Sequence, residues 1–185
     1  MSMKTILCTM LALGLGVSAA YAEPSVKRSS SSIIVKEALT DEGLSQAKEI
    51  AGGIKMPEFK LEGIKDADLA KFCQAFPNAT RLSVKGGLTS IAPVAGLKNL
   101  TYFELEANSV TDMSPLAKLT QLTRISLKSA KMGPDLKWMT GLTALREIEI
   151  NAGSALTSFE GFPALKGDPR VALNGASPAD LSPLK

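Results

Sequence analysis

The chain has 185 residues, 45% of them apolar, and carries 21 lysines and arginines against 18 aspartates and glutamates. Its net charge of +3 is too small to predict nucleic-acid binding, which depends on clustered basic surface. The chain contains no histidine, which excludes the Ser-His-Asp and Cys-His nucleophile systems and metal sites built on imidazole. Length and composition indicate a single folded domain.

Residues 1–22 have the sequence of a bacterial signal peptide. Lys4 supplies a positive charge, residues 5–19 form an apolar run, and residues 20–22 read A-Y-A, a cleavage site of the A-x-A type. The apolar run is too short to span a bilayer, and no other stretch approaches ~20 continuous apolar residues. We expect a mature protein that begins at Glu23, lies in the periplasm or outside the cell, and has no integral membrane segment.

Cleavage would remove Cys8 and leave Cys73 as the single cysteine, so no internal disulfide is expected. Cys73 lies with Leu69, Phe72 and Phe76 at spacings of three and four, which place the four residues on one side of a short helix. This pattern predicts a buried structural cysteine, and a reactive or pairing thiol is the alternative.

Residues 23–37 are predicted to form a flexible tether, because they contain Lys27, Arg28 and four consecutive serines. Within them, residues 33–35 read as a short strand. Residues 38–55 predict an N-terminal cap with a helix from Thr40, the N-cap residue, to Ile50, followed by two glycines. A helix at this position would cover the apolar edge of the first repeat of a stacked structure.

From residue 56 to residue 185 the chain repeats one pattern about six times, at intervals of 21 to 23 residues. Each repeat begins with two apolar residues at a spacing of two, which places both on one face of a short strand. Apolar residues at spacings of three follow, as expected for a helical or 3₁₀ return. The six apolar pairs are Phe59/Leu61, Leu82/Val84, Phe103/Leu105, Ile125/Leu127, Ile148/Ile150 and Val171/Leu173.

The run from Asn108 to Leu119, N-S-V-T-D-M-S-P-L-A-K-L, resembles the short-repeat leucine-rich class typified by the bacterial internalins, and the likeness covers roughly residues 56–185. The resemblance implies an α/β leucine-rich-repeat solenoid with a parallel concave β-sheet and short 3₁₀ or helical convex turns. It also implies a binding module. The family's asparagine ladder is nearly absent, because the positions equivalent to Asn108 hold Ile64, Gly87, Ala130, Gly153 and Ala176.

The residues between and beside the apolar pairs are predicted to point to the concave face, where their charge alternates from repeat to repeat. One interpretation is that neighbours pair across the sheet, as Lys85 with Glu106, Glu106 with Lys128, and Arg124 with Glu147. The other is that this strip binds a partner, and the two are compatible. The predicted partner-binding residues are Tyr102, Glu104, Glu106, Arg124, Ser126, Lys128, Glu147 and Glu149 on this face, with Trp138 on the convex side.

Trp138 has two interpretations, packing against a neighbouring coil or acting as an aromatic anchor for a partner. The carboxylate pairs Glu147/Glu149 and Glu104/Glu106 are the remaining catalytic candidates, but they would line an open, wet surface. Asp66 and Asp68 lack the further oxygens and the glycine of a calcium loop, and Asp66 is interpreted as a helix cap. No cofactor or metal site is predicted.

The sequence therefore predicts an exported, non-catalytic module that binds a protein or peptide on its concave face. A cell-envelope carbohydrate or peptidoglycan-binding protein is the alternative, although this face offers only one aromatic residue, Tyr102. Nucleic acid is not an expected partner. The last repeat is not followed by a capping element, so either a partner or a second copy covers that edge, or the chain continues.

Overall fold

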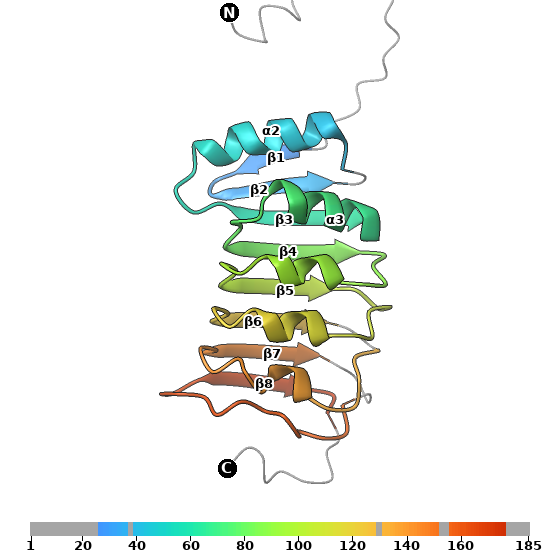
Figure 1. Ribbon diagram of the computed structural model, residues 1–185, viewed down its shortest axis with the longest axis vertical. Coiled ribbons are helices and arrows are strands. Elements are labelled where there is room, and N and C mark those ends of the chain that lie inside the picture. Colours follow the sequence, from blue (N-terminus) through green and yellow to red (C-terminus); the bar gives the residue numbers. More distant parts are fainter. Residues whose placement is uncertain (1–25, 37–38, 129–130, 152–155, 177–185) are drawn as a thin grey trace, which may run out of the picture.

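The computed structural model describes residues 26–36, 39–128, 131–151 and 156–176, so the predicted signal peptide lies outside the described residues. An eight-stranded sheet runs the length of the molecule, and its strands neighbour one another in chain order (Figure 1). All adjacent pairs are parallel except the first. The strands are β1 (Val26–Ser29), β2 (Ser32–Lys36), β3 (Glu58–Ile64), β4 (Arg81–Gly86), β5 (Tyr102–Glu106), β6 (Arg124–Lys128), β7 (Glu147–Asn151) and β8 (Arg170–Asn174).

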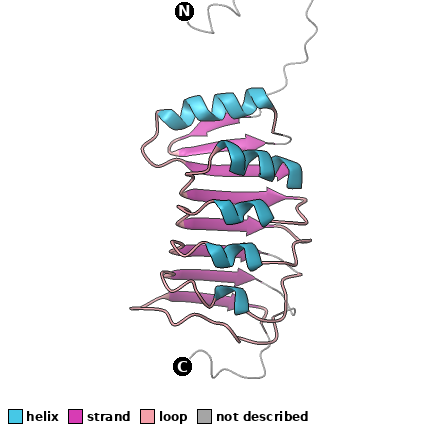
Figure 2. Ribbon diagram, in the orientation of Figure 1, coloured by secondary structure: helices cyan, strands magenta, loops and turns pink. Residues whose placement is uncertain are grey.

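The helices lie on one side of this sheet and on its first end, as Figure 2 shows. The helix α2 covers the end of the sheet at β1 and β2, while the others connect successive parallel strands (Figure 1). A 3₁₀ helix rises further per residue than an α-helix, which suits short connections of this kind. The helical elements are α2 (Asp41–Gly52), α3 (Asp66–Ala75) and the 3₁₀ helices η1 (Ala92–Gly96), η2 (Ser114–Lys118) and η3 (Lys137–Met139).

The strand register confirms the predicted repeat. Phe59 lies opposite Leu82, and the series continues through every later apolar pair to Val171. The paired side chains of β3 to β7 are 0–2% exposed, so they form one continuous core between the sheet and the helices. Because each repeat buries its apolar edge against the next, the architecture depends on stacking of neighbours.

The short strand predicted at residues 33–35 is present as part of β2, but the prediction of a flexible tether is wrong for residues 26–36. They form an antiparallel hairpin, β1 and β2, whose turn is Ser30-Ser31 with Ser30 at a φ of 56°. The hairpin is held by burial of Val26, Ile33 and Val35, which are 0–5% exposed. Its serines occupy the turn and the strand ends, so their composition gave no sign of the order that tertiary packing imposes.

The helix predicted from Thr40 to Ile50 is present as α2. Thr40 is its N-cap, and the Thr40 hydroxyl accepts a hydrogen bond from the Gly43 N–H at 3.1 Å. Ala47 is buried, and Leu44 and Ile50 pack partly buried against the core. Asp68, in α3, joins this cap to the first repeat, because its carboxylate accepts the N–H groups of Leu39 at 2.9 Å and Lys65 at 3.1 Å.

A ladder of threonines, Thr80, Thr101 and Thr123, precedes β4, β5 and β6 and connects neighbouring repeats. The carbonyl of Thr80 accepts the N–H groups of Thr101 and Tyr102, and the carbonyl of Thr101 accepts those of Thr123 and Arg124. The hydroxyls of Thr101 and Thr123 each donate to the same carbonyls at 3.0 Å. These bonds satisfy the backbone carbonyls of Thr80 and Thr101, and the sequence pattern did not predict them.

A second recurrent bond begins four of the return segments. In each of them a serine or aspartate side chain accepts the backbone N–H two residues further on, and in three of them this bond fixes the turn that starts a 3₁₀ helix, η1, η2 or η3. The four pairs recur at 22 or 23 residues and are Ser90 with Ala92, Asp112 with Ser114, Asp135 with Lys137, and Ser158 with Glu160.

Candidate binding face

The alternation of the strands places every second side chain on the face of the sheet turned away from the helices, here called the open face. Because the parallel strands are in register, these side chains form three rows that run across the sheet from β2 to β8. The first row is Ser32, Glu58, Arg81, Tyr102, Arg124, Glu147 and Arg170; the middle row is Ile34, Lys60, Ser83, Glu104, Ser126, Glu149 and Ala172; the third row is Lys36, Glu62, Lys85, Glu106, Lys128, Asn151 and Asn174.

Tyr102 lies at the centre of the first row, between two arginines from the neighbouring strands. The guanidinium carbon of Arg81 is 4.7 Å from the ring centroid and that of Arg124 is 5.4 Å away, both within cation–π range. The side chain is 9% exposed. Burial, followed by the hydrogen bond to Glu104, raises the pKa of Tyr102 to about 12, so the phenol stays protonated.

Glu104 and Glu149, in the middle row, act as acceptors for neighbouring hydroxyls. Glu104 accepts the Tyr102 hydroxyl at 3.0 Å and the Ser83 hydroxyl at 2.8 Å through the same oxygen. Glu149 accepts the Ser126 hydroxyl at 3.2 Å. The two serine hydroxyls donate across to the neighbouring strand, whereas Tyr102 and Glu104 lie on the same strand. Together these hydrogen bonds hold the middle of the open face in one arrangement.

The third row is the more accessible part of the face. Lys85 and Glu106 form an ion pair at 2.7 Å with side chains 61% and 43% exposed, and Lys36 pairs with Glu62 at 3.6 Å. The hydrogen bond and charge of Lys85 lower the pKa of Glu106, and Lys128 contributes to the same shift through its charge. Since these pairs are exposed, they contribute little to stability and remain available to exchange partners.

The predicted cross-strand pairs are largely present. Lys85 meets Glu106, and Arg124 meets Glu147 at 3.2 Å. Lys128 acts on Glu106 through its charge, without a direct ion pair among the contacts of the described residues. The first interpretation of the charge alternation, pairing between neighbours, therefore accounts for much of the pattern.

The predicted partner-binding residues differ in accessibility. Tyr102 and Ser126, at 9% and 5% exposure, are buried among their neighbours, whereas Arg124, Glu106, Lys128 and Glu147 keep accessible charged groups. Tyr102 was expected to be exposed, but it is buried between Arg81 and Arg124, and its role in partner binding stays a prediction. Arg124 was among the predicted residues, whereas Arg81 was not, although β4 and β6 have the same outward order of arginine, serine and lysine.

Trp138 lies in η3, on the helical side of the sheet, and packs partly buried against the core. Its indole Nε1 is inaccessible and has no hydrogen-bond partner among the described residues. This position agrees with packing against the coil. Its role as an aromatic anchor stays a prediction.

Asp66 is not a helix cap, since the N-cap of α3 is Lys65. Its carboxylate instead accepts the N–H groups of Thr89 and Ser90, at 2.9 and 3.2 Å, together with the Thr89 hydroxyl. These hydrogen bonds, that of the Thr89 hydroxyl first, lower the pKa of Asp66. The residue thus joins the first repeat to the second.

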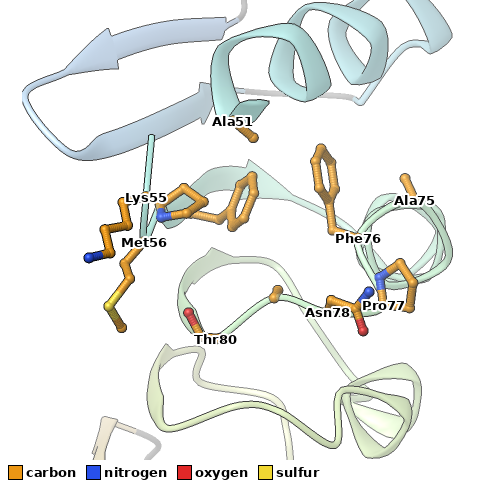
Figure 3. Close-up of a pocket in the computed structure, with 11 residues that line it drawn as sticks. Ala51, Lys55, Met56, Ala75, Phe76, Pro77, Asn78 and Thr80 are labelled. Atoms are coloured by element: carbon orange, nitrogen blue, oxygen red, sulfur yellow. The ribbon is translucent and has the colours of Figure 1, made fainter. Parts of the chain in front are cut away.

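A hollow of about 330 Å³ lies away from the open face, between the ends of α2 and α3 (Figure 3). Phe59 and Phe76 form its aromatic wall with a centroid distance of 4.6 Å, and Lys55, Asn78 and Thr80 add polar groups. Within the described residues no group of acidic or cysteine side chains is arranged to hold a metal ion. The described part of the chain also contains no helix that is long and apolar enough to cross a membrane.

The comparison with solved structures finds similar proteins. The structure is similar to the crystal structure of an internalin (InlF) from Listeria monocytogenes, with a TM-score of 0.41 and 18% sequence identity. The alignment covers 80% of this chain and 55% of that one, so the chain spans about half the length of the internalin structure. No family model matches the sequence, and no curated protein matches it.

Proposed function

We propose that this chain is an exported, non-catalytic leucine-rich-repeat solenoid that binds a protein or peptide across the open face of its sheet. The observation that carries the proposal is the third row, in which Lys36, Glu62, Lys85, Glu106 and Lys128 stand in register with alternating charge. Parallel strands are ~4.8 Å apart, so successive charges repeat at a fixed interval that only a partner with matching charges complements.

The partner is expected to carry both charges. Basic and acidic side chains interleave along the face, so no large field of one sign remains to attract a polyanion. The internal pairs are weak because they are exposed, and a partner can replace them without a large loss of stability. Glu106, Arg124, Lys128, Glu147 and Glu149 are the proposed contact residues, with Tyr102, Glu104 and Ser126 holding them in place.

The carbohydrate alternative is less well supported. Sugar sites usually offer an aromatic ring whose face is free for stacking. The ring of Tyr102, the aromatic residue of this face, has Arg81 and Arg124 against it and is almost fully buried. A protein partner that pairs with the accessible charges needs no such ring.

The test exchanges charges within pairs. The double variant Arg124→Glu/Glu147→Arg keeps an ion pair within the protein but exchanges the positions of its positive and negative charges on the open face. The matched control, Lys137→Glu/Glu160→Lys, makes the same reversal on the helical side, where Lys137 and Glu160 pair at 3.0 Å. Both variants are expected to keep the wild-type circular dichroism spectrum, and neither should lose more than about 2 kcal/mol, because exposed pairs contribute at most ~1 kcal/mol and the contact of Arg124 with Tyr102 about as much.

Each protein is immobilised and exposed to a cell-envelope extract of the source bacterium, and captured proteins are quantified. The proposal predicts a protein that wild type and control retain and that the open-face variant loses. Equal capture by all three would refute the binding face. Retention of purified peptidoglycan by wild type and control, but not by the open-face variant, would overturn the choice of a protein partner in favour of the carbohydrate alternative.

A further inference from the structure

The two ends of the sheet are protected differently. At the first end, α2 lies over β1 and β2 (Figure 1). The edge strand β1 also carries Arg28 on the core side, opposite Ile33, and this residue is exposed. A charge that points inward on an edge strand is a device by which proteins prevent another strand from pairing there.

Among the residues that the structure describes, the last strand, β8, has no comparable protection. Val171 and Leu173 occupy the core-side positions, where β7 holds Ile148 and Ile150. The two isoleucines are 0–1% exposed, whereas Val171 is 41% exposed and Leu173 is only partly buried. The end of the apolar core is thus accessible at β8, and its core-side residues carry no charge.

The backbone of β8 also has groups available for pairing. Arg170 donates its N–H to the carbonyl of Arg146, so in this parallel ladder the peptide groups of Arg170, Ala172 and Asn174 point to β7. The N–H and carbonyl groups of Val171 and Leu173 therefore point away from the sheet. These four groups are those to which a further strand would bond.

We propose that β8 pairs with the β8 strand of a second copy of this chain, antiparallel and centred on Ala172. In this register Val171 lies opposite the partner's Leu173 and Leu173 lies opposite the partner's Val171. All four outward peptide groups then take part in hydrogen-bonded pairs, and the apolar side chains meet on the core side. Two eight-stranded sheets become one sheet, with both open faces on the same side.

The sequence of the strand favours this register over its neighbours. A pairing centred on Val171 would use position 169, which is a proline without an N–H. A pairing centred on Leu173 would use Gly175, whose φ of 75° lies outside strand geometry. In the pairing centred on Ala172, Arg170 lies opposite Asn174 of the second copy, so no like charges meet across the open face.

Pairing of β8 with the β1 edge of another copy is less favourable. That arrangement would stack copies in one direction without closing, and it would place the exposed Arg28 at the apolar end of the core. Antiparallel pairing of two β8 strands closes on itself through a two-fold axis. It leaves the protected β1 edges at the two far ends.

Cross-linking at the two-fold axis tests the proposal directly. In a non-hydrogen-bonded antiparallel pair the Cα atoms are about 4.5 Å apart, within the range of a disulfide. Ala172→Cys in the full mature chain, oxidised with oxidised glutathione, is expected to form a covalent dimer. The matched control, Arg170→Cys, lies on the same strand and face. In the proposed register its thiol and that of the second copy would be four positions apart along the strands, so this variant is expected to form no covalent dimer, and its thiols exchange only with glutathione.

The native Cys73 does not interfere, because burial raises the pKa of its thiol to about 12. Failure of Ala172→Cys to cross-link, or cross-linking of Arg170→Cys to the same extent, would overturn the proposed pairing. If Ala172→Cys does not cross-link and the wild type is monomeric, the chain's own later residues or another partner cover β8.

Sedimentation equilibrium without a cross-link supplies the second measurement. Val171→Lys places a charge in the proposed contact and is expected to weaken self-association at least about tenfold. Met56→Lys is the control, because Met56 is the other strongly exposed large apolar residue of the described part, at 57% exposure, and lies far from β8 in the chain. A wild type that stays monomeric at its highest soluble concentration, or equal weakening by both variants, would contradict the proposal. Capture of an envelope protein on the open face does not depend on this result.

Discussion

Replacement of Asp68 by alanine is predicted to release the N-terminal cap from the first repeat. The Asp68 carboxylate accepts two backbone N–H groups, and the two donors differ in environment. Leu39, whose N–H is 2.9 Å from Oδ1, is 2% exposed, so its N–H would be left buried without a partner, at a cost of ~1–3 kcal/mol. Loss of the bond to Lys65, at the start of α3, adds about 1 kcal/mol of the kind measured for helix caps.

The expected loss is therefore about 2–4 kcal/mol in the free energy of unfolding. Urea unfolding followed by circular dichroism measures it, and hydrogen exchange locates it, since amides of β2 and α2 should lose protection before those of β5 and β6. Asp112→Ala is the matched control, because Asp112 is exposed and accepts only the Ser114 N–H from the backbone. A loss no greater for Asp68→Ala than for Asp112→Ala would refute the reasoning.

Three further predictions follow from single positions. Gly86→Ala should destabilise the protein by ~1–3 kcal/mol, because a Cβ there would lie 2.3 Å from the Ile64 carbonyl oxygen, while Gly87→Ala, with open space around it, should change the urea midpoint little. Equal midpoints for the two variants would show that the backbone adjusts. The lowered pKa of Asp66 stabilises the folded state above the unfolded value near 3.8, and this stability is lost as the pH falls through the folded pKa. Asp66→Asn should therefore reduce the fall in urea midpoint between pH 5.5 and about pH 2.5, and an unchanged fall would assign it to other groups. The buried Cys73 thiol, with its pKa raised to about 12, should resist iodoacetamide at pH 8 in the folded protein and react in urea; equal rates would contradict its burial.

The repeat could be predicted from the sequence because it depends on a simple property, the alternation of apolar side chains. Phe103 and Leu105 are fully buried while Glu104 and Glu106 between and beside them are not, as a spacing of two requires. The same periodicity fixed the register of five parallel strand pairs. Thr40 could be identified as an N-cap because that signal is local.

The parts that were missed depend on tertiary contacts. Residues 26–32 have the composition of a tether, but pairing with β2 and packing of Val26 against the core place them in a hairpin. Asp66 and Asp68 are two positions apart in the same first turn, and only the structure shows that one bonds forward to Thr89 and the other back to Leu39. Local sequence carries no information about partners more than twenty residues away.

The candidate site was predicted in part for the same reason. The alternation of strand side chains placed the residues on the correct face, and their charges predicted the pairs of Lys85 and Arg124. Side-chain burial within the face could not be predicted, because it arises from contacts between strands. The ring of Tyr102 is covered by arginines whose positions in the register lie one repeat before and one repeat after it.

The central claim, that consecutive repeats place equivalent side chains in one row across the open face, is tested most directly by distances between spin labels. One label stays at Asn151 on β7, and the second is placed at Lys85, Glu62 or Lys36, which lie three, four and five strands away in the third row. Double electron–electron resonance should give distances that increase by ~4.8 Å with each strand, from about 14 to about 24 Å plus a constant label contribution. Distances that do not rise in this order would contradict the stacked register, and with it the proposed binding face.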